Sequence, residues 1–188
     1  MPPRHPLAKL APKEQHMHIY CLFCLVSHVP VIKKVLDHSF SCEVLQASIL
    51  QRKWIKGTPT DEPHDYLPGY LFIYSEEPIT DMYRILNLDG VIRFLKYEST
   101  SDYELQGTDR FFAESLYKKN GRISYVPVYE VGERLVIKDG LFQNQQAEIK
   151  KVDRRKQRLL LEFNFDNTTR TIWLGYDVVK EDIKLNEI

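Results

Sequence analysis

The sequence predicts an α+β protein with two domains, an N-terminal α/β sandwich over residues 17–120 and a small C-terminal β-barrel over residues 128–188, joined by a linker at residues 121–127. Short apolar runs that alternate with segments of helical apolar spacing indicate the first domain. Apolar and polar residues that alternate with a period of two, between turn-forming pairs, indicate the second. Because a short sheet has exposed edges, closure into a barrel is favoured, although an open sheet fits the same pattern.

The composition is typical of a globular protein in a reducing compartment. Hydrophobic residues make up 43% of the 188, which excludes wholesale disorder. No apolar run approaches the roughly 18 residues of a membrane-spanning helix, so we expect a cytoplasmic protein without membrane contact. Cys21, Cys24 and Cys42 are an odd number of cysteines, which argues against a disulfide framework.

Residues 1–16 contain four prolines and no apolar periodicity, so we expect a disordered tail or an upstream start-site artefact. The first domain then follows the order β-α-β-β-α-β-α, with an antiparallel-rich sheet. The expected strands are 19–26, 42–50, 66–74 and 91–97. The expected inward faces of the helices are Val31, Ile32, Val35 and Leu36; Ile79, Met82, Tyr83 and Leu86; and Phe111, Phe112, Ser115 and Leu116. We expect Thr108 to cap the third helix and Asn120-Gly121 to close it.

The C-terminal domain has room for five strands between about Val128 and Lys180. One strand is marked by inward-facing residues that alternate with polar ones, namely Leu159, Leu161, Phe163 and Phe165. Asp139-Gly140 and Asp166-Asn167 are pairs that favour tight turns. The polar residues 51–65, which lie within the first domain, indicate a protruding loop or a hairpin.

A dense cluster of cations lies at one turn of the C-terminal domain. Six cations face one carboxylate between residues 150 and 158, so the local charge is +6 − 1 = +5, while the whole chain is neutral. The cations are Lys150, Lys151, Arg154, Arg155, Lys156 and Arg158. Phosphate is the natural partner of such a cluster, although a solvated face explains it equally well. Since the chain is neutral, something else must bring it to a nucleic acid.

These features together resemble the NusG-like transcription elongation factors over nearly all of residues 17–182. The resemblance rests on Ile19-Tyr20, on the sequence LPGY at residues 67–70 where the family has FPGY, on residues 87–94, and on Gly132 with residues 139–142. Residues 107–110, 151–158 and 172–175 further resemble the LoaP branch of specialised paralogues, which includes antiterminators of long operons. The family fold is an NGN-like domain followed by a small SH3-like KOW barrel.

The resemblance implies a monomeric protein, not an enzyme and without a cofactor, that binds bacterial RNA polymerase through its N-terminal domain and promotes readthrough of terminators. The implied polymerase contacts are Tyr20, Tyr66, Leu67, Pro68, Gly69 and Tyr70, for which ordinary core packing is the alternative role. In the LoaP branch, the cationic turn implies binding to an RNA leader hairpin. Arg52, Lys53 and Lys56 become candidate contacts to non-template DNA, although a solvated loop also accounts for them.

The sequence also departs from the family pattern. Ile19 and Leu67 replace the usual tryptophan and phenylalanine, and Ala147 replaces a glycine of the KOW segment. Phe142 matches the exposed aromatic residue with which general NusG proteins engage Rho or NusE, so it is a candidate protein contact.

Three other interpretations compete with this one. Cys21 and Cys24 have the spacing of a metal site, but residues three apart on a strand point to opposite faces, so we expect no metal there. Cys24 with His28 lacks the glycine turn that nucleophilic catalysis needs. The remaining alternative is a ribosome-associated or other structural KOW-type RNA-binding protein, against which the lack of overall positive charge argues.

Overall fold

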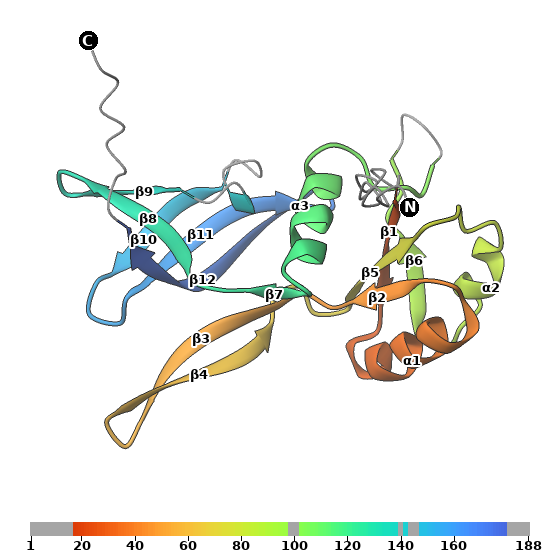
Figure 1. Cartoon of the computed structure of the whole chain (residues 1–188), viewed down its shortest axis with the longest axis horizontal. Helices are drawn as coiled ribbons and strands as arrows, with labels where there is room; N and C mark the ends of the chain where they lie inside the picture. Colours follow the sequence, from red (N-terminus) through yellow and green to blue (C-terminus); the bar gives the residue numbers. More distant parts are fainter. Residues whose placement is uncertain (1–16, 98–101, 139–140, 143–146, 180–188) are drawn as a thin grey trace, which may run out of the picture.

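The computed structural model describes residues 17–97, 102–138, 141–142 and 147–179, as a four-stranded, a five-stranded and a three-stranded sheet, with helix α3 (Gly107–Lys118) between the first two (Figure 1). The expected disordered tail at residues 1–16 and the expected turn at Asp139-Gly140 lie outside the described residues. In the part of the chain that is described, no helix is long and apolar enough to cross a membrane.

The N-terminal sheet has four antiparallel strands in the order β2-β5-β1-β6. Their bounds are β1 His18–Cys24, β2 Glu43–Leu45, β5 Tyr70–Ser75 and β6 Val91–Phe94. One face packs against α1 (Val29–Ser39), which follows a short 3₁₀ turn η1 (Val26–His28), and against α2 (Met82–Leu86). The other face packs against α3 (Gly107–Lys118). The antiparallel sheet is the one that the sequence predicts, and of helices on one or on both faces, the structure has helices on both.

The polar segment of the N-terminal domain is a hairpin, formed by β3 (Ser48–Ile55) and β4 (Thr58–Asp65). Its turn residues Lys56 and Gly57 both have positive φ angles, 49° and 81°, as a two-residue type I′ turn requires. The hairpin projects from the body of the protein (Figure 1). The sequence left a loop or a hairpin open for residues 51–65, and the structure has the hairpin.

The C-terminal domain contains the five expected strands, in the order β10-β11-β12-β8-β9. Their bounds are β8 Val126–Val131, β9 Arg134–Ile137, β10 Glu148–Asp153, β11 Arg158–Phe165 and β12 Thr168–Val178. Strand β12 pairs with β11 along its first part and with β8, in parallel, along its last part. Because β9 and β10 stand at the two ends of this order, the described strands form a half-barrel and not a closed barrel.

The stretch predicted as a linker contains a strand of its own, β7 (Arg122–Ile123), which pairs in parallel with β3. It follows Asn120 and Gly121, whose φ angles of 50° and 75° end α3 as expected. Ile123 is buried in the same core as Phe112 of α3 and Phe163 of β11. The connection is therefore held in place by pairing and packing, and the division into two domains stays a prediction.

The buried faces of the helices match the expected ones only in part. In α1 the buried residues are Val29, Ile32 and Leu36, and Val31 is 63% exposed. Helix α2 spans five residues, so Ile79 precedes it, and Tyr83 is 76% exposed.

Helix α3 begins at Gly107 with Gln106 as its N-cap, so Thr108 lies in the first turn and does not cap the helix. Phe112 is buried, whereas the neighbouring Phe111 is exposed. Adjacent apolar residues fit either of two helix faces, and only the packing partner decides between them.

Candidate protein and nucleic-acid interfaces

The predicted polymerase contacts lie on two opposite faces of the N-terminal sheet. Tyr20 points towards α1 and α2, where its ring meets Phe94 edge-on at 6.4 Å between centroids. Its hydroxyl oxygen accepts a hydrogen bond from the backbone N–H of Ile79 at 3.3 Å, and burial raises the pKa of this hydroxyl. In this structure Tyr20 is a core residue, and it is not brought together with residues 66–70.

The LPGY segment is a tight turn that leads into β5. The backbone N–H of Tyr70 donates to the carbonyl oxygen of Leu67 at 3.1 Å, and Gly69 has a φ angle of +87°. Proline in the second position and glycine with positive φ in the third are typical of a type II turn. A Cβ atom on Gly69 would lie 2.6 Å from the carbonyl oxygen of Cys24, so the turn also needs glycine for space. The turn buries Leu67 and leaves Pro68 exposed.

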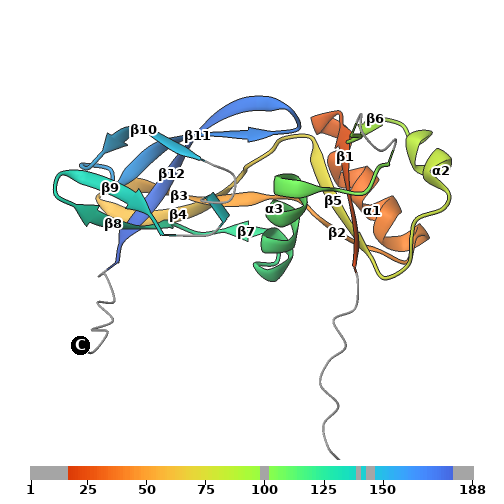
Figure 2. The same cartoon turned by 90° about the horizontal axis from the view of Figure 1, so that it is seen from above.

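The two tyrosines of this segment are covered by the C-terminal domain. Tyr66 stacks on Phe112 of α3 and on Phe163 of β11, with centroid distances of 5.7 and 5.2 Å. Phe165 of β11 contacts Tyr70, Phe72 and Phe112 at 5.3, 5.8 and 5.7 Å. In Figure 2 hairpin β11–β12 extends from the left towards β5 and β1 of the N-terminal sheet. We call this set the aromatic contact: Tyr66, Tyr70, Phe72, Phe112, Phe163 and Phe165.

Polar groups surround the aromatic contact at the turn between β11 and β12. Asp166 and Asn167 both have φ angles of +54°, which confirms the predicted turn. The carboxylate of Asp166 accepts a hydrogen bond from the Tyr70 hydroxyl at 2.9 Å and pairs with Arg93 of β6. Arg170 of β12 donates to the Tyr70 hydroxyl oxygen at 2.8 Å. Burial, together with Asp166, raises the pKa of Tyr70 to about 12.

A buried carboxylate of α3 completes this region. Asp109 accepts a hydrogen bond from the Tyr97 hydroxyl at 2.9 Å and another from the backbone of Asp166. Burial raises the pKa of Asp109, and the nearby carboxylate of Asp166 adds to the effect. The alternation of apolar and polar residues predicts that Phe163 and Phe165 face inward, but it contains no signal that this face continues onto the N-terminal sheet.

The cationic turn joins β10 to β11. Three of its six cations are paired with carboxylates in the folded protein. Lys150 bridges Glu148 and Glu162 at 2.7 and 2.8 Å. Arg154 pairs with Glu130 of β8 at 2.7 Å, and Arg158 pairs with Asp153 at 3.3 Å. With these four carboxylates counted, the six cations leave a charge of +6 − 4 = +2.

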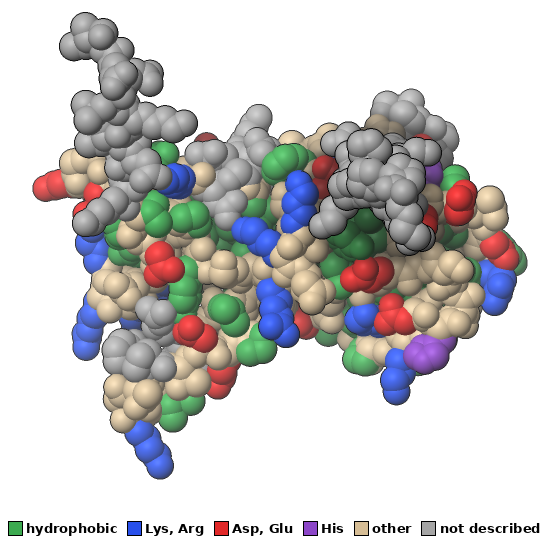
Figure 3. Space-filling view, viewed as in Figure 1, with side chains coloured by type: hydrophobic (Ala, Val, Ile, Leu, Met, Phe, Trp, Pro, Cys, Tyr) green, Lys and Arg blue, Asp and Glu red, His purple; other side chains and the backbone are tan. Residues whose placement is uncertain are grey.

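Three cations of the turn keep their charge available. Within the described residues, Lys151, Arg155 and Lys156 are exposed and have no carboxylate partner. On the face seen in Figure 3, Lys and Arg are spread among Asp and Glu and do not gather in one continuous patch. A phosphate would therefore meet a few free cations at one turn.

The second predicted nucleic-acid contact, hairpin β3–β4, has no net charge. Residues 48–65 carry Arg52, Lys53 and Lys56 against Asp61, Glu62 and Asp65, so the sum is +3 − 3 = 0. Lys56 lies exposed in the turn. The base of the C-terminal sheet holds the hairpin, since the Tyr125 hydroxyl donates to Asp61. The charge balance gives this hairpin a weaker attraction to DNA than the cations alone suggested.

Phe142, the candidate protein contact, is buried in this structure, unlike the exposed aromatic residue that it matches in the family. Its side chain is 1% exposed and belongs to the core that the C-terminal domain shares with α3. The carbonyl oxygen of Phe142 accepts a hydrogen bond from the backbone N–H of Ala147 at 3.0 Å. A large apolar ring beside an open half-barrel is stabilised by burial, and a partner would reach it only after it left the core.

Cys21 and Cys24 lie in two different cores, on opposite faces of β1, as the strand geometry predicts. Burial raises the pKa of both thiols, and that of Cys24 to about 11. In the described part of the chain, no group of three or more His, Cys, Asp or Glu side chains is arranged to hold a metal ion.

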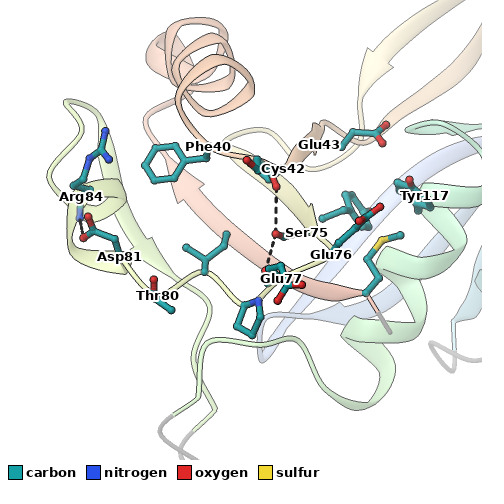
Figure 4. Close-up of a pocket in the computed structure, with 15 residues that line it drawn as sticks. Phe40, Cys42, Glu43, Ser75, Glu76, Glu77, Thr80, Asp81, Arg84 and Tyr117 are labelled. Atoms are coloured by element: carbon teal, nitrogen blue, oxygen red, sulfur yellow. Dashed lines mark hydrogen bonds between the residues drawn. The ribbon is translucent and has the colours of Figure 1, made fainter. Parts of the chain in front are cut away.

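A pocket of about 600 Å³ opens between the ends of β2 and β5, α2 and α3 (Figure 4). Its charged lining is mostly acidic, with Glu43, Glu76, Glu77 and Asp81 against Arg84. Ser75 in its wall donates to the carbonyl oxygens of Ser41 and Glu77 at 3.3 and 2.7 Å. An acidic lining repels phosphate, so this pocket is unsuited to nucleic acid.

No protein-family model matches the chain. In sequence it is 26% identical, over 121 residues, to the transcription termination/antitermination protein NusG of Rickettsia felis and to that of Rickettsia conorii, and 24% identical to that of Rickettsia typhi. Each alignment covers 62% of this chain and 60% of the relative, so the chain spans about three fifths of the length of these relatives.

A solved structure described as domain interaction in Thermotoga maritima NusG matches the fold. The TM-score is 0.50 with 14% sequence identity, over 85% of this chain and 94% of that one. At this identity the likeness concerns the fold alone. In sequence and in fold, the chain is therefore similar to NusG transcription factors.

Proposed function

We propose that this protein is a specialised bacterial transcription elongation and antitermination factor of the LoaP type. Its N-terminal domain binds RNA polymerase, and the cationic turn of its C-terminal domain binds RNA, such as a leader hairpin. The observation that carries the proposal is the similarity to NusG proteins over 121 residues, together with the type II turn at the LPGY sequence. Such a factor needs no covalent chemistry, because a bias of about 1.4 kcal/mol towards the elongating state changes its population tenfold.

Polymerase binding through Tyr66 and Tyr70 requires the C-terminal domain to move away, since β11 covers both rings in the aromatic contact, and Leu67 between them is buried as well. The closed arrangement thus lowers the apparent affinity for polymerase by the fraction of molecules that are open. If about 1% were open, binding would be 100-fold weaker than in the open form. Closed and open forms are then two states whose balance polymerase and RNA shift.

Two unsatisfied polar atoms support a separable contact. Among the described residues, the Tyr66 hydroxyl and Nε of Arg170 are buried without a hydrogen-bond partner. Each such group costs roughly 1–3 kcal/mol in the closed form, and water satisfies it when the domains part. The aromatic pairs favour closure by about 0.5–1.5 kcal/mol each beyond their buried area. The two effects oppose each other and keep the closed form only moderately stable.

RNA binding by a turn of charge +2 is weak in free solution, and tethering compensates for this. When the N-terminal domain holds polymerase, the emerging RNA is present at a local concentration on the order of millimolar. The three free cations, Lys151, Arg155 and Lys156, then suffice to hold it near the C-terminal domain. Non-template DNA near Arg52, Lys53 and Lys56 is a secondary partner in the same complex.

The test is readthrough of an intrinsic terminator by purified bacterial RNA polymerase with and without this protein. Templates with and without the RNA leader of its own operon are compared. Readthrough that depends on the leader is the expected result, and readthrough on all templates would indicate a general elongation factor. Failure on every template, with RNA binding retained and no binding to polymerase, would favour a ribosome-associated or other structural RNA-binding protein.

A further inference from the structure

On the outer face of the C-terminal sheet, a strip of side chains extends from the cationic turn to Trp173, an aromatic residue that no site described above uses. Since Leu159 and Leu161 of β11 point inward, Leu160 between them points outward. It pairs with Lys151 of β10 on one side and with Trp173 of β12 on the other. Residues directly opposite in neighbouring strands share a face, so a cation, a leucine and an indole lie in one row.

A planar cation lies over the indole at the end of this row. The guanidinium of Arg158 is 4.5 Å from the centroid of the Trp173 ring. Its Nε donates to Asp153 at 3.3 Å, and Asp153 in turn accepts the backbone N–H of Lys156 at 3.1 Å. The carboxylate thus holds both the arginine and the turn, so the guanidinium is fixed above the ring.

A second aromatic ring, that of Tyr125, lies over Gly175, the residue paired with Arg158. Gly175 lies directly opposite Arg158, and a Cβ atom on Gly175 would overlap the ring of Tyr125. The ring of Tyr125 therefore fills the space above Gly175. The arginine is bordered by flat apolar surface from β12 and from the residue that precedes β8.

We propose that the Arg158–Trp173 stack binds an unpaired base of single-stranded RNA, while Lys151, Arg155 and Lys156 bind the flanking phosphates. Bases in single strands stack on guanidinium planes and aromatic rings, and a cationic groove beside them holds the backbone. A paired base inside a helix presents no free plane to such a stack. The proposal rests on the RNA binding proposed above and goes beyond it, since it assigns a base-stacking site beside the turn.

The charges on this face agree with an anionic ligand. Two carboxylates of the same face, Glu148 and Glu162, are both bonded to Lys150, which offsets one of their charges. Asp153 is paired with Arg158. The three cations without a carboxylate partner lie at the stack end of the face, on β10 and on the turn.

The tryptophan itself reports on the site. The chain has two tryptophans, Trp54 and Trp173, so the variant W54F leaves Trp173 as the single indole. Titration of full-length W54F with a uridine-rich single-stranded RNA should quench its emission to a plateau, and a blunt-ended duplex of matched length, which has no unpaired base, should quench it little. Equal quenching by duplex, or RNA binding by anisotropy with unchanged Trp173 emission, would overturn the proposal.

Charge and stacking are separated by substitution. R158K keeps the charge but lacks the planar guanidinium group, so its affinity for RNA should fall about tenfold while the salt dependence stays nearly that of the wild type. R158A should lose affinity by about the same factor. The triple variant K151A/R155A/K156A should instead flatten the slope of log K against log salt by about 2. R134A removes an exposed arginine of β9 and serves as the matched control, while thermal unfolding checks that each variant is folded.

If R158K bound RNA like the wild type, the stack would not be the site. The failure of the proposed function has a different signature, because a stack that binds RNA without any terminator readthrough would leave the site in place and exclude the antitermination role. Absence of RNA binding by the wild-type chain would overturn the stack and the RNA part of the proposed function together.

Discussion

The two ends of strand β11 differ in what covers them. At the carboxyl end, Phe163 and Phe165 are buried against the N-terminal domain and Asp166 is bonded to Tyr70. At the amino end, Arg158 borders an exposed turn with three free cations. One strand, about 25 Å long, therefore carries an apolar contact at one end and a salt-dependent surface at the other. The difference separates two questions, whether the domains are closed and whether RNA is bound, and variants can address each alone.

The largest effect is expected from Phe165→Ala. Removal of a fully buried phenylalanine costs about 3–5 kcal/mol, and here the lost contacts are with Tyr70, Phe72 and Phe112. We expect the domains to part, hydrogen exchange in residues 66–75 to rise, and binding to polymerase to strengthen. Phe94→Ala is the matched control, because Phe94 is equally buried in the core that faces α1 and α2. If both variants changed polymerase binding alike, the aromatic contact would not control it.

A smaller effect is expected from Asp166→Asn. Asparagine tolerates the φ angle of +54° at this turn, so the hairpin persists while the charge that faces Arg93 is lost. The contact should weaken by roughly 1–2 kcal/mol, measured as increased hydrogen exchange at the domain contact. Asn167→Asp at the exposed neighbouring position should leave the exchange unchanged. An unaltered contact in Asp166→Asn would mean that the aromatic rings alone hold the domains.

Alkaline pH provides a third way to weaken the contact between the carboxyl end of β11 and the N-terminal domain. The pKa of Tyr70 in the closed form is about 12, above the ordinary value of 10.0. Its contribution to stability is therefore complete below pH 10 and is lost as the pH rises towards 12. Unfolding experiments across this window should show the loss in the wild type and a smaller one in Tyr70→Phe. An identical pH profile in the two proteins would rule out this cause.

The smallest effects concern the amino end of β11 and distinguish its two adjacent arginines. Arg155 is free, whereas Arg154 is paired with Glu130 and with the carbonyl oxygen of Glu133. Arg155→Ala should therefore flatten the salt slope of RNA binding by about 0.7, and Arg154→Ala by less. Neither should alter polymerase binding. A larger effect at Arg154 would indicate that RNA displaces Glu130 from its partner.

Much of the fold could be predicted from local patterns. Period-two alternation identified the inner face of β11, and Asp166-Asn167 and Asn120-Gly121 have the positive φ angles that their residue types allow. The LPGY sequence contains its own turn, because proline and glycine at those positions favour type II geometry. These features are decided within a few residues of the chain, where sequence and conformation are directly linked.

The tertiary structure alone decided which surfaces meet. Periodicity defines the face of a strand or helix but not the element that packs against it. The burial of Tyr66 under Phe163 and the outward position of Val31 could therefore not be predicted from the sequence. The net charge of the cationic turn also depends on which elements meet in the fold. The sequence gives the cationic turn a charge of +5, and only folding brings Glu130 of β8 to Arg154. Coulomb interaction depends on distance in space, whereas sequence records distance along the chain.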